Sequence, residues 1–257
     1  MSALFVTPLS FSAASTSPAP LLGSVANLNI DVPGLAWTYG LTTPYLIVDL
    51  GASAVSYDTV ALVGSNLRST DTVQIRTGTT NTGIGNYAGT ATAAWTGNKP
   101  SVAKAMSIYQ LGTARTERYV RIDLSAPSHP DGQVQLWRLV IGKAVTTAGV
   151  NYDAEIGFQD QSIITTGPGY RSVDEYDVFV SWKFRTDYIS EAAWRSDWNP
   201  MLRAVGTRRG LLFVADDQHP EYFQTDAIFG CLTSNASGKR SGYNAWALEA
   251  TVTALAA

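Results

Sequence analysis

The chain has 257 residues, of which 45% are hydrophobic and 15% charged, and its formal net charge is −3. Such a chain is long enough for one large β domain or two ordinary domains, and its composition excludes an intrinsically disordered protein. The acidic balance, with a pI near 5.4, argues against nucleic-acid binding, which needs a basic patch. No apolar run approaches the roughly 20 residues of a membrane span, and the single Cys231 excludes an internal disulfide framework.

The first 145 residues predict an all-β domain, because short apolar runs alternate with segments rich in Gly, Ser and Thr. In PYLIVDLGASAVSYDTVALVGSNL (44–67), Leu46 and Val48 alternate with Tyr45 and Ile47, so both faces of this strand are apolar, as in a central strand of a sandwich. The runs RYVRIDL and QLWRLVIG are separated by a loop with Pro-Asp-Gly turn chemistry. We expect these two runs to form an antiparallel pair.

The composition changes in GKAVTTAGVNYD, which predicts two domains, 1–145 and 146–257. The second domain opens with a long strand over 175–185 that has Trp182 on an apolar face. A helix is expected over about 190–206, with Ser190 as its N-cap and a break or restart at Pro200. Strands follow, and the order of elements fits a β-barrel or sandwich that carries one helix.

Residues with catalytic or metal-binding chemistry are few. The only cluster that resembles a metal site is Asp216, Asp217, His219 and Glu221, but its spacing matches no calcium loop, and an acidic surface loop is the favoured interpretation. Ser101 and Lys104 match a Ser-x-x-Lys pattern without its companion motifs. We therefore expect no cofactor, no metal and no enzymatic activity.

The order of several motifs resembles a known family. ANLNIDVPGLAWTYG, PYLIVDLG, YDTVALVGSNL, ARTERYVRIDL and QLWRLVIG are similar, over about residues 10–143, to the discoidin-type (galactose-binding-like) jelly-roll β-sandwich. This resemblance implies that Leu46, Val48, Leu50, Val60 and Leu62 build the sandwich. Asp49 and Asn66 are expected to bond backbone amides in the turns.

The second half resembles a different family. The order of its long aromatic strand, its Trp-containing helix, GLLFVADD and DAIFGCLTS is similar to minor tail proteins of tailed bacteriophages, in which a discoidin-like module precedes a tail-tube-like domain. The resemblance implies a non-enzymatic virion structural protein of a tail tip or baseplate, assembled in the host cytoplasm. Its expected partners are further copies of itself and other tail proteins.

Two sets of aromatic residues separate this hypothesis from its alternative, a module that binds a carbohydrate or a host receptor. Glycan contact would use Trp37, Tyr39, Tyr87 and Trp95, for which core packing is the favoured interpretation. Oligomer contacts would use Phe179, Trp194 and Trp198, and we expect the second domain to carry most of them. An enzymatic depolymerase is the least favoured hypothesis, because no catalytic motif supports it.

Overall fold

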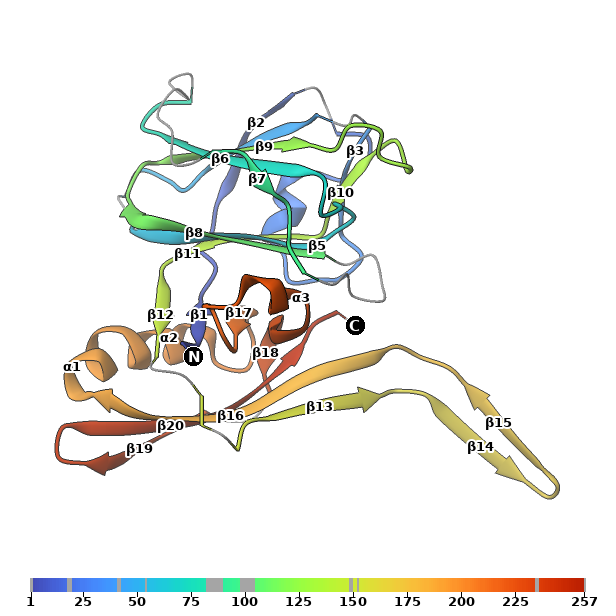
Figure 1. Cartoon of the computed structure of the whole chain (residues 1–257), viewed down its shortest axis with the longest axis vertical. Coiled ribbons are helices and arrows are strands. Elements are labelled where there is room, and N and C mark those ends of the chain that lie inside the picture. The colour runs from blue at the N-terminus through green and yellow to red at the C-terminus, as the bar shows by residue number, and fades with distance from the viewer. Residues whose placement is uncertain are drawn as a thin grey trace.

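The protein has two β-rich bodies stacked along its long axis, with a long hairpin that projects from one of them (Figure 1). The mainly β fold class expected from the sequence is confirmed. The computed structural model describes residues 2–17, 20–40, 43–53, 55–81, 90–97, 105–147, 150–151, 153–233 and 236–256.

The first body is a sandwich of two antiparallel sheets, as the resemblance to discoidin-type domains implies. One sheet consists, in spatial order, of β2 (Ser12–Ser17), β4 (Tyr45–Asp49), β9 (Tyr119–Ser125), β6 (Thr72–Gly78) and β7 (Thr92–Ala93). The facing sheet consists of β11 (Arg138–Gly142), β5 (Tyr57–Ser65) and β8 (Ala105–Arg115). A separate pair, β10 (Val134–Leu136) with β3 (Trp37–Tyr39), and the short helix η1 (Val25–Asn29) close one end.

Period-two alternation decides which side chains fill the sandwich. Leu46 and Val48 point into the buried core, whereas Tyr45 lies on the outer face of the same strand. The Asp49 carboxylate accepts from the Gly51 amide at 2.8 Å, which confirms its expected turn bond. The Asn66 side-chain oxygen also accepts from a backbone amide at 2.8 Å, but this amide belongs to Gln135, 69 residues further along the chain.

One pairing prediction was wrong. RYVRIDL becomes β9, which lies between β4 and β6, while QLWRLVIG becomes β11, which pairs with β5 in the opposite sheet. Both edges of β9 are already occupied, so the loop after it crosses between sheets instead of closing a hairpin. His129 fixes this loop, since its buried ring lies 2.9 Å from the Asn66 carbonyl oxygen.

The second body is built on one large antiparallel sheet. Its spatial order is β12 (Ala144–Thr146), β1 (Leu4–Val6), β17 (Leu211–Val214), β18 (Ala227–Leu232), β20 (Ala245–Ala254), β16 (Val178–Ser190) and β13 (Glu155–Asp160), with β19 (Ser237–Gly242) paired to β20. Among the described strands this path does not return on itself, so the barrel alternative gives way to an open sheet.

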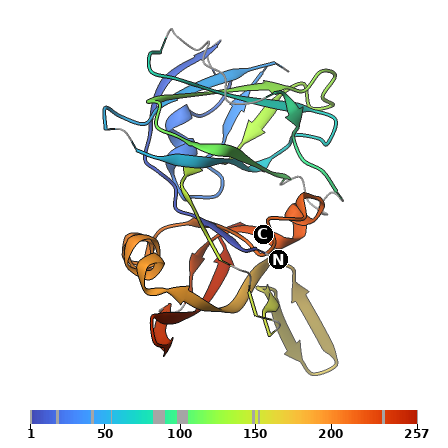
Figure 2. The same ribbon diagram turned by 60° about the vertical axis from the view of Figure 1, so that its left-hand side comes forward.

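The expected helix is present and covers one face of this sheet (Figures 1 and 2). It runs through α1 (Glu191–Ala193), the π-helical turn η2 (Trp194–Trp198) and α2 (Asn199–Val205), and two short turns, η3 (Pro220–Tyr222) and α3 (Phe223–Asp226), lie elsewhere in the body. The Ser190 hydroxyl accepts from the Ala193 amide at 3.2 Å, which confirms the predicted N-cap. Pro200 is the second residue of α2, directly after the π-helical turn, so the helix restarts there instead of ending.

The two bodies meet through a third apolar cluster. Val63 and Val140 of the sandwich pack in it against Leu212 and Phe229 of the large sheet. Strand β1, which lies at the start of the sequence, pairs with β17, so the predicted division at residue 145 places one strand of the large sheet in the first domain. The Gln224 amide group also forms a two-point bond with the Met106 backbone, at 2.9 and 2.6 Å.

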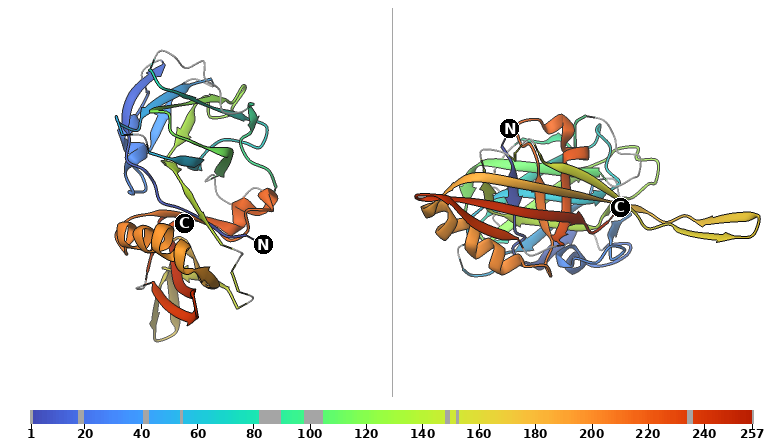
Figure 3. Two further views of the ribbon diagram at one scale, coloured as in Figure 1. Left: turned by 90° about the vertical axis from the view of Figure 1, so that its left-hand side faces the viewer. Right: turned by 90° about the horizontal axis from the view of Figure 1, so that it is seen from below.

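The projecting hairpin, which we call the arm (residues 155–180), begins as β13 paired with β16. It continues outward as the pair β14 (Ile163–Gly167) and β15 (Tyr170–Asp174). Seen from below, the β14–β15 pair extends beyond both bodies (Figure 3).

Candidate functional site

The arm carries an unusual amount of exposed apolar surface. Within the described residues, half of the large apolar side chains that are exposed lie in this one hairpin. They are Ile156, Phe158, Ile163, Ile164, Tyr170, Val173, Tyr176 and Val178. Contiguous exposed apolar surface of this kind marks an interaction site more often than a free surface.

The inner part of the arm continues a face that is buried in the body. Trp182, Val180 and Val178 follow one another on the same face of β16, and cross-strand pairing adds Ile156 and Phe158 beside them. Trp182 is 8% exposed, whereas Phe158 is 71% exposed. The same apolar face therefore leaves the core and runs on into solvent.

The outer part of the arm has two different faces, which its register defines. Ile164 pairs with Val173 and Thr166 with Arg171, so these four side chains share one face. On the opposite face, the Tyr170 ring lies directly over Gly167, where an added Cβ would come within 2.4 Å of the ring. Gly167 thus makes room for Tyr170, and the Arg171 face is left open for a partner.

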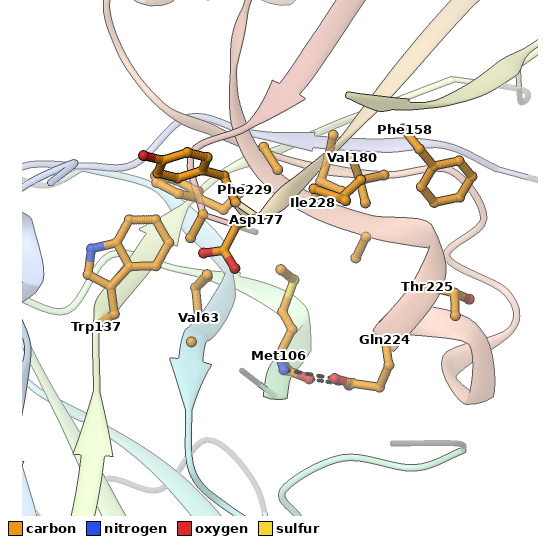
Figure 4. A pocket seen from close by; sticks show the side chains of 16 residues that line it. Val63, Met106, Trp137, Phe158, Asp177, Val180, Gln224, Thr225, Ile228 and Phe229 are labelled. Atoms are coloured by element: carbon orange, nitrogen blue, oxygen red, sulfur yellow. Dashed lines mark hydrogen bonds between the residues drawn. The ribbon is translucent and has the colours of Figure 1, made fainter. Parts of the chain in front are cut away.

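A cavity of about 540 Å³ opens at the base of the arm, between the two bodies (Figure 4). This volume lies within the roughly 300–1,000 Å³ typical of binding clefts. Its walls come from the sandwich (Val63, Met106 and Trp137), from the arm (Phe158 and Val178) and from the segment that includes α3 and β18 (Thr225, Ile228 and Phe229).

Among the residues that the structure describes, Asp177 is the only one with a charged side chain that lines this cavity. Its carboxylate points into the space between the apolar walls (Figure 4). Among the described residues, no side chain or backbone group forms an ion pair or hydrogen bond with it. A cationic group that enters the cavity would therefore find both apolar contacts and an available carboxylate.

The predicted glycan contacts are placed differently from what sugar binding requires. Trp37 and Tyr39 are 0% and 1% exposed and belong to the sandwich core, so neither ring face is open to a sugar. Trp95 is also buried, and its indole N–H donates to the Leu67 carbonyl oxygen at 2.8 Å. Tyr87 lies outside the described residues.

Two of the three predicted oligomer contacts are buried within their own subunit. Trp194 stacks on Trp246 with ring centroids 4.6 Å apart, and Trp198 packs edge-on against Phe5 at 5.1 Å. The helix face that carries both residues covers its own sheet, which corrects the prediction for them. Phe179, on the arm, is half-buried, and its proposed contact with a partner stays a prediction.

The acidic cluster after β17 forms a hydrogen-bonded loop. His219 Nδ1 lies 3.1 Å from a Glu221 carboxylate oxygen, and the Asp216 carboxylate accepts from the Gln218 amide at 3.1 Å. A backbone hydrogen bond lowers the pKa of Glu221 most, and the hydrogen bond with His219 lowers it further. In the described part of the chain, no three His, Cys, Asp or Glu side chains come together in a metal-binding arrangement.

A polar patch that sequence reasoning missed lies on the outer face of the five-stranded sheet. Its members are Tyr45, Gln74, Arg76, Arg121 and Asp123, which adjacent strands bring side by side. The Arg121 guanidinium lies 3.9 Å from the centre of the Tyr45 ring, and Asp123 pairs with Arg121 at 2.6 Å and with Arg76 at 3.1 Å. The alternation of β9 in the sequence indicated that Arg121 and Asp123 share one face. The sequence did not indicate that β4 and β6 lie beside β9.

Comparison with known proteins identifies no family. No protein-family profile matches the sequence, and no curated protein gives a significant match. None of the helices in the described ranges has the length and apolar character needed to cross a bilayer.

Several solved structures are similar to part of the chain. One is reduced XRCC1 bound to the catalytic domain of DNA polymerase β, with 13% identity, a TM-score of 0.42, and coverage of 53% of this chain and 99% of that chain. Another is chitosan-binding module 1 of a chitosanase/glucanase from Paenibacillus sp. IK-5, with 17% identity, a TM-score of 0.35, and coverage of 53% and 96%. The CBM32 of AlyQ in complex with 4,5-unsaturated mannuronic acid gives 17% identity, a TM-score of 0.32, and the same coverage. At these values the likeness does not extend to a ligand or an activity.

Proposed function

We propose that this chain is a non-enzymatic assembly subunit that binds further copies of itself through the arm. The observation that carries the proposal is the exposed apolar surface of β13, β14, β15 and the outer half of β16. A two-stranded hairpin is marginally stable in water by itself, and its open edges invite pairing. Burial against a partner would satisfy both the apolar side chains and the edges.

The arm's position also suits assembly. It extends away from the sandwich and from its own sheet (Figure 3), so a second molecule can approach it without a rearrangement of either body. At the base of the arm, Val180 packs against the core cluster of the large sheet, which includes Trp182 and Phe213 and holds this end of the arm in place. A long-lived interface needs such a preorganised surface.

The finer proposal is a structural protein of a bacteriophage tail tip or baseplate, located in the virion. It is supported by the order of sequence motifs, in which a discoidin-like sandwich precedes a sheet domain with one helix, and by the arm. The partners would be copies of this chain and neighbouring tail proteins. The genes that adjoin its coding sequence test this proposal, because genes for other tail components are expected beside it.

Light scattering and electron microscopy of the full chain test the assembly function. We expect oligomers at micromolar concentration, and we expect the double variant Ile164→Ser/Val173→Ser to shift them toward monomer. The matched control is Leu21→Ser/Leu22→Ser, which removes from the sandwich two apolar side chains that are more exposed, 66% and 68%, than Ile164 and Val173, 53% and 47%. A wild-type chain that stays monomeric at all concentrations would contradict the proposal.

Carbohydrate binding by the sandwich is the second candidate function. The outer-sheet patch favours it, because a half-exposed Tyr45 ring adjoins polar groups of Arg76, Arg121 and Asp123 that suit sugar hydroxyls. A glycan array followed by titration calorimetry tests it. Binding that Tyr45→Ala abolishes, in a chain that remains monomeric, would replace the assembly function with this one.

A further inference from the structure

The cavity at the base of the arm has mainly apolar walls and one available charge, and its natural occupant must match both. We propose that it is the receptor for the arm of a second copy of this chain, with Arg171 of that copy paired to Asp177. This inference rests on the proposed assembly function and specifies which surfaces meet.

Charge complementarity identifies the occupant. Arg171 is the only cationic residue between Glu155 and Trp182, and in the described part of the chain its guanidinium has no ion pair or hydrogen bond. Asp177 is the only charged residue in the cavity wall, and it is likewise without a partner among the described residues. Each supplies the charge that the other lacks.

The apolar surfaces match in the same register. Arg171 shares its face of the outer arm with Val173 and Ile164, so a cation and an apolar cross-strand pair enter together. In the cavity, Asp177 is surrounded by apolar walls that include Phe158 and Ile228. When this face docks, Val173 and Ile164 contact those walls while the guanidinium reaches the carboxylate.

The ion pair does not form within one copy. Arg171 lies in β15 and Asp177 in the segment that joins β15 to β16, and among the described residues no ion pair or hydrogen bond links them. The ladder from Ile163–Asp174 to Gly167–Tyr170 pairs β14 with β15 along the outer arm, and the tip of the arm lies away from both bodies (Figure 1). The carboxylate therefore depends on another molecule for its partner.

The resulting contact is head-to-tail, because the arm and the cavity are different surfaces of one chain. Each copy donates one arm and accepts one arm, so the contact repeats until it closes a ring or extends as a filament. The outer face of the sandwich and its outer-sheet patch stay uncovered in this arrangement.

Charge reversal tests the pair in the full chain. We expect Arg171→Glu and Asp177→Arg each to raise the concentration for half-assembly by about 30-fold or more, since like charges at an interface are strongly unfavourable. An equimolar mixture of the two variants should assemble again, because each arm then meets a cavity of opposite charge. The double variant in a single chain should also assemble.

Sedimentation equilibrium measures these effects, with Arg203→Glu as a charge-matched control on the exposed side of α2. Circular dichroism checks that each variant is folded, which is expected because both exchanged side chains are exposed. If wild type assembles and the single variants assemble equally well, the cavity is not the receptor, although the assembly function stands. If the single variants are weakened but the mixture is not restored, this pairing is wrong. A monomeric wild type overturns both proposals.

Discussion

The sandwich and the arm use the same alternating strand pattern and end in opposite environments. Strand β16 shows the difference along one chain segment: Phe184 is 2% exposed, Trp182 8% and Val178 42%, and Tyr176 just before the strand is 58% exposed. In the sandwich, the inward-facing side chains of the strands, such as Leu46, Val48 and Val60, lie in the core between the two sheets. The same strand pattern is therefore covered in the body and uncovered in the arm, where the proposed cover is another copy of the chain.

The largest expected effect belongs to the buried end of this strand. Trp182→Ala should lower the free energy of unfolding by about 3–5 kcal/mol, because it leaves a cavity among Phe213, Phe184 and Val252. Urea denaturation followed by circular dichroism measures the loss. An unchanged midpoint would place the Trp182 face at the surface and remove the contrast with the arm.

The next effect tests how firmly the sandwich is covered by the second body. The buried Arg138 guanidinium pairs with Asp31 at 2.9 Å, and the other Asp31 oxygen accepts from the Gly210 amide at 2.9 Å, across the two bodies. Burial lowers the pKa of Arg138, and Asp31 opposes that shift. Asp31→Ala should cost about 2–4 kcal/mol, because it leaves the arginine charge buried without its carboxylate.

Asp31→Asn provides the control for that prediction, since it keeps the size and one acceptor oxygen but removes the charge. We expect it to destabilise the protein by less than Asp31→Ala. Thermal unfolding of both variants should remain a single transition if the bodies unfold together. Two separate transitions in the wild type would show that the bodies are independent, against the shared apolar cluster.

A pH-dependent effect marks where the helix meets the large sheet. Glu191 accepts from the Trp246 indole N–H at 2.6 Å and from Arg195 and Arg240, and these bonds lower its pKa from 4.5 to about 2. A carboxyl with a depressed pKa in the folded state stabilises that state above its unfolded pKa and loses this contribution as the pH falls. The loss should therefore occur between about pH 4.5 and pH 2.

Glu191→Gln isolates this contribution from the other carboxylates. The difference in Tm between wild type and variant should be largest near neutral pH and should shrink as the pH approaches 2. Scanning calorimetry in a pH series measures it. A difference that stays constant over the series would mean that the Glu191 charge does not contribute.

Local signals made much of the fold predictable, and long-range contacts set the limit. The Ser190 cap and the Asp49 turn bond each join residues two or three positions apart, whereas the Asn66 side chain bonds the amide of Gln135, 69 residues away. The three residues of β1 carry no signal that they pair with β17 in the other body, because strand pairing is decided by the whole fold.

The candidate site was less predictable for the same reason. Trp37 and Tyr39 are aromatic residue types that can stack on a sugar ring. Both belong to β3, which pairs with β10, and both are buried in the sandwich core. The aromatic residues that are exposed, such as Phe158 and Tyr170, lie in strands whose pattern is equally typical of a core. Alternation in the sequence predicts which side chains share one face of a strand. Only the packed structure shows whether other residues cover that face.

The smallest expected effect on stability belongs to the exposed part of the arm. Tyr176→Ala should change the free energy of unfolding by no more than about 0.5 kcal/mol, because the ring is 58% exposed and its removal leaves no enclosed cavity. In the same preparation the variant should assemble less readily than wild type, since Tyr176 lines the cavity that accepts the neighbouring arm. Denaturation at low protein concentration and light scattering at high concentration separate the two quantities. A large loss of stability in the monomer would show that Tyr176 is covered by its own chain, and the arm would then resemble the sandwich after all.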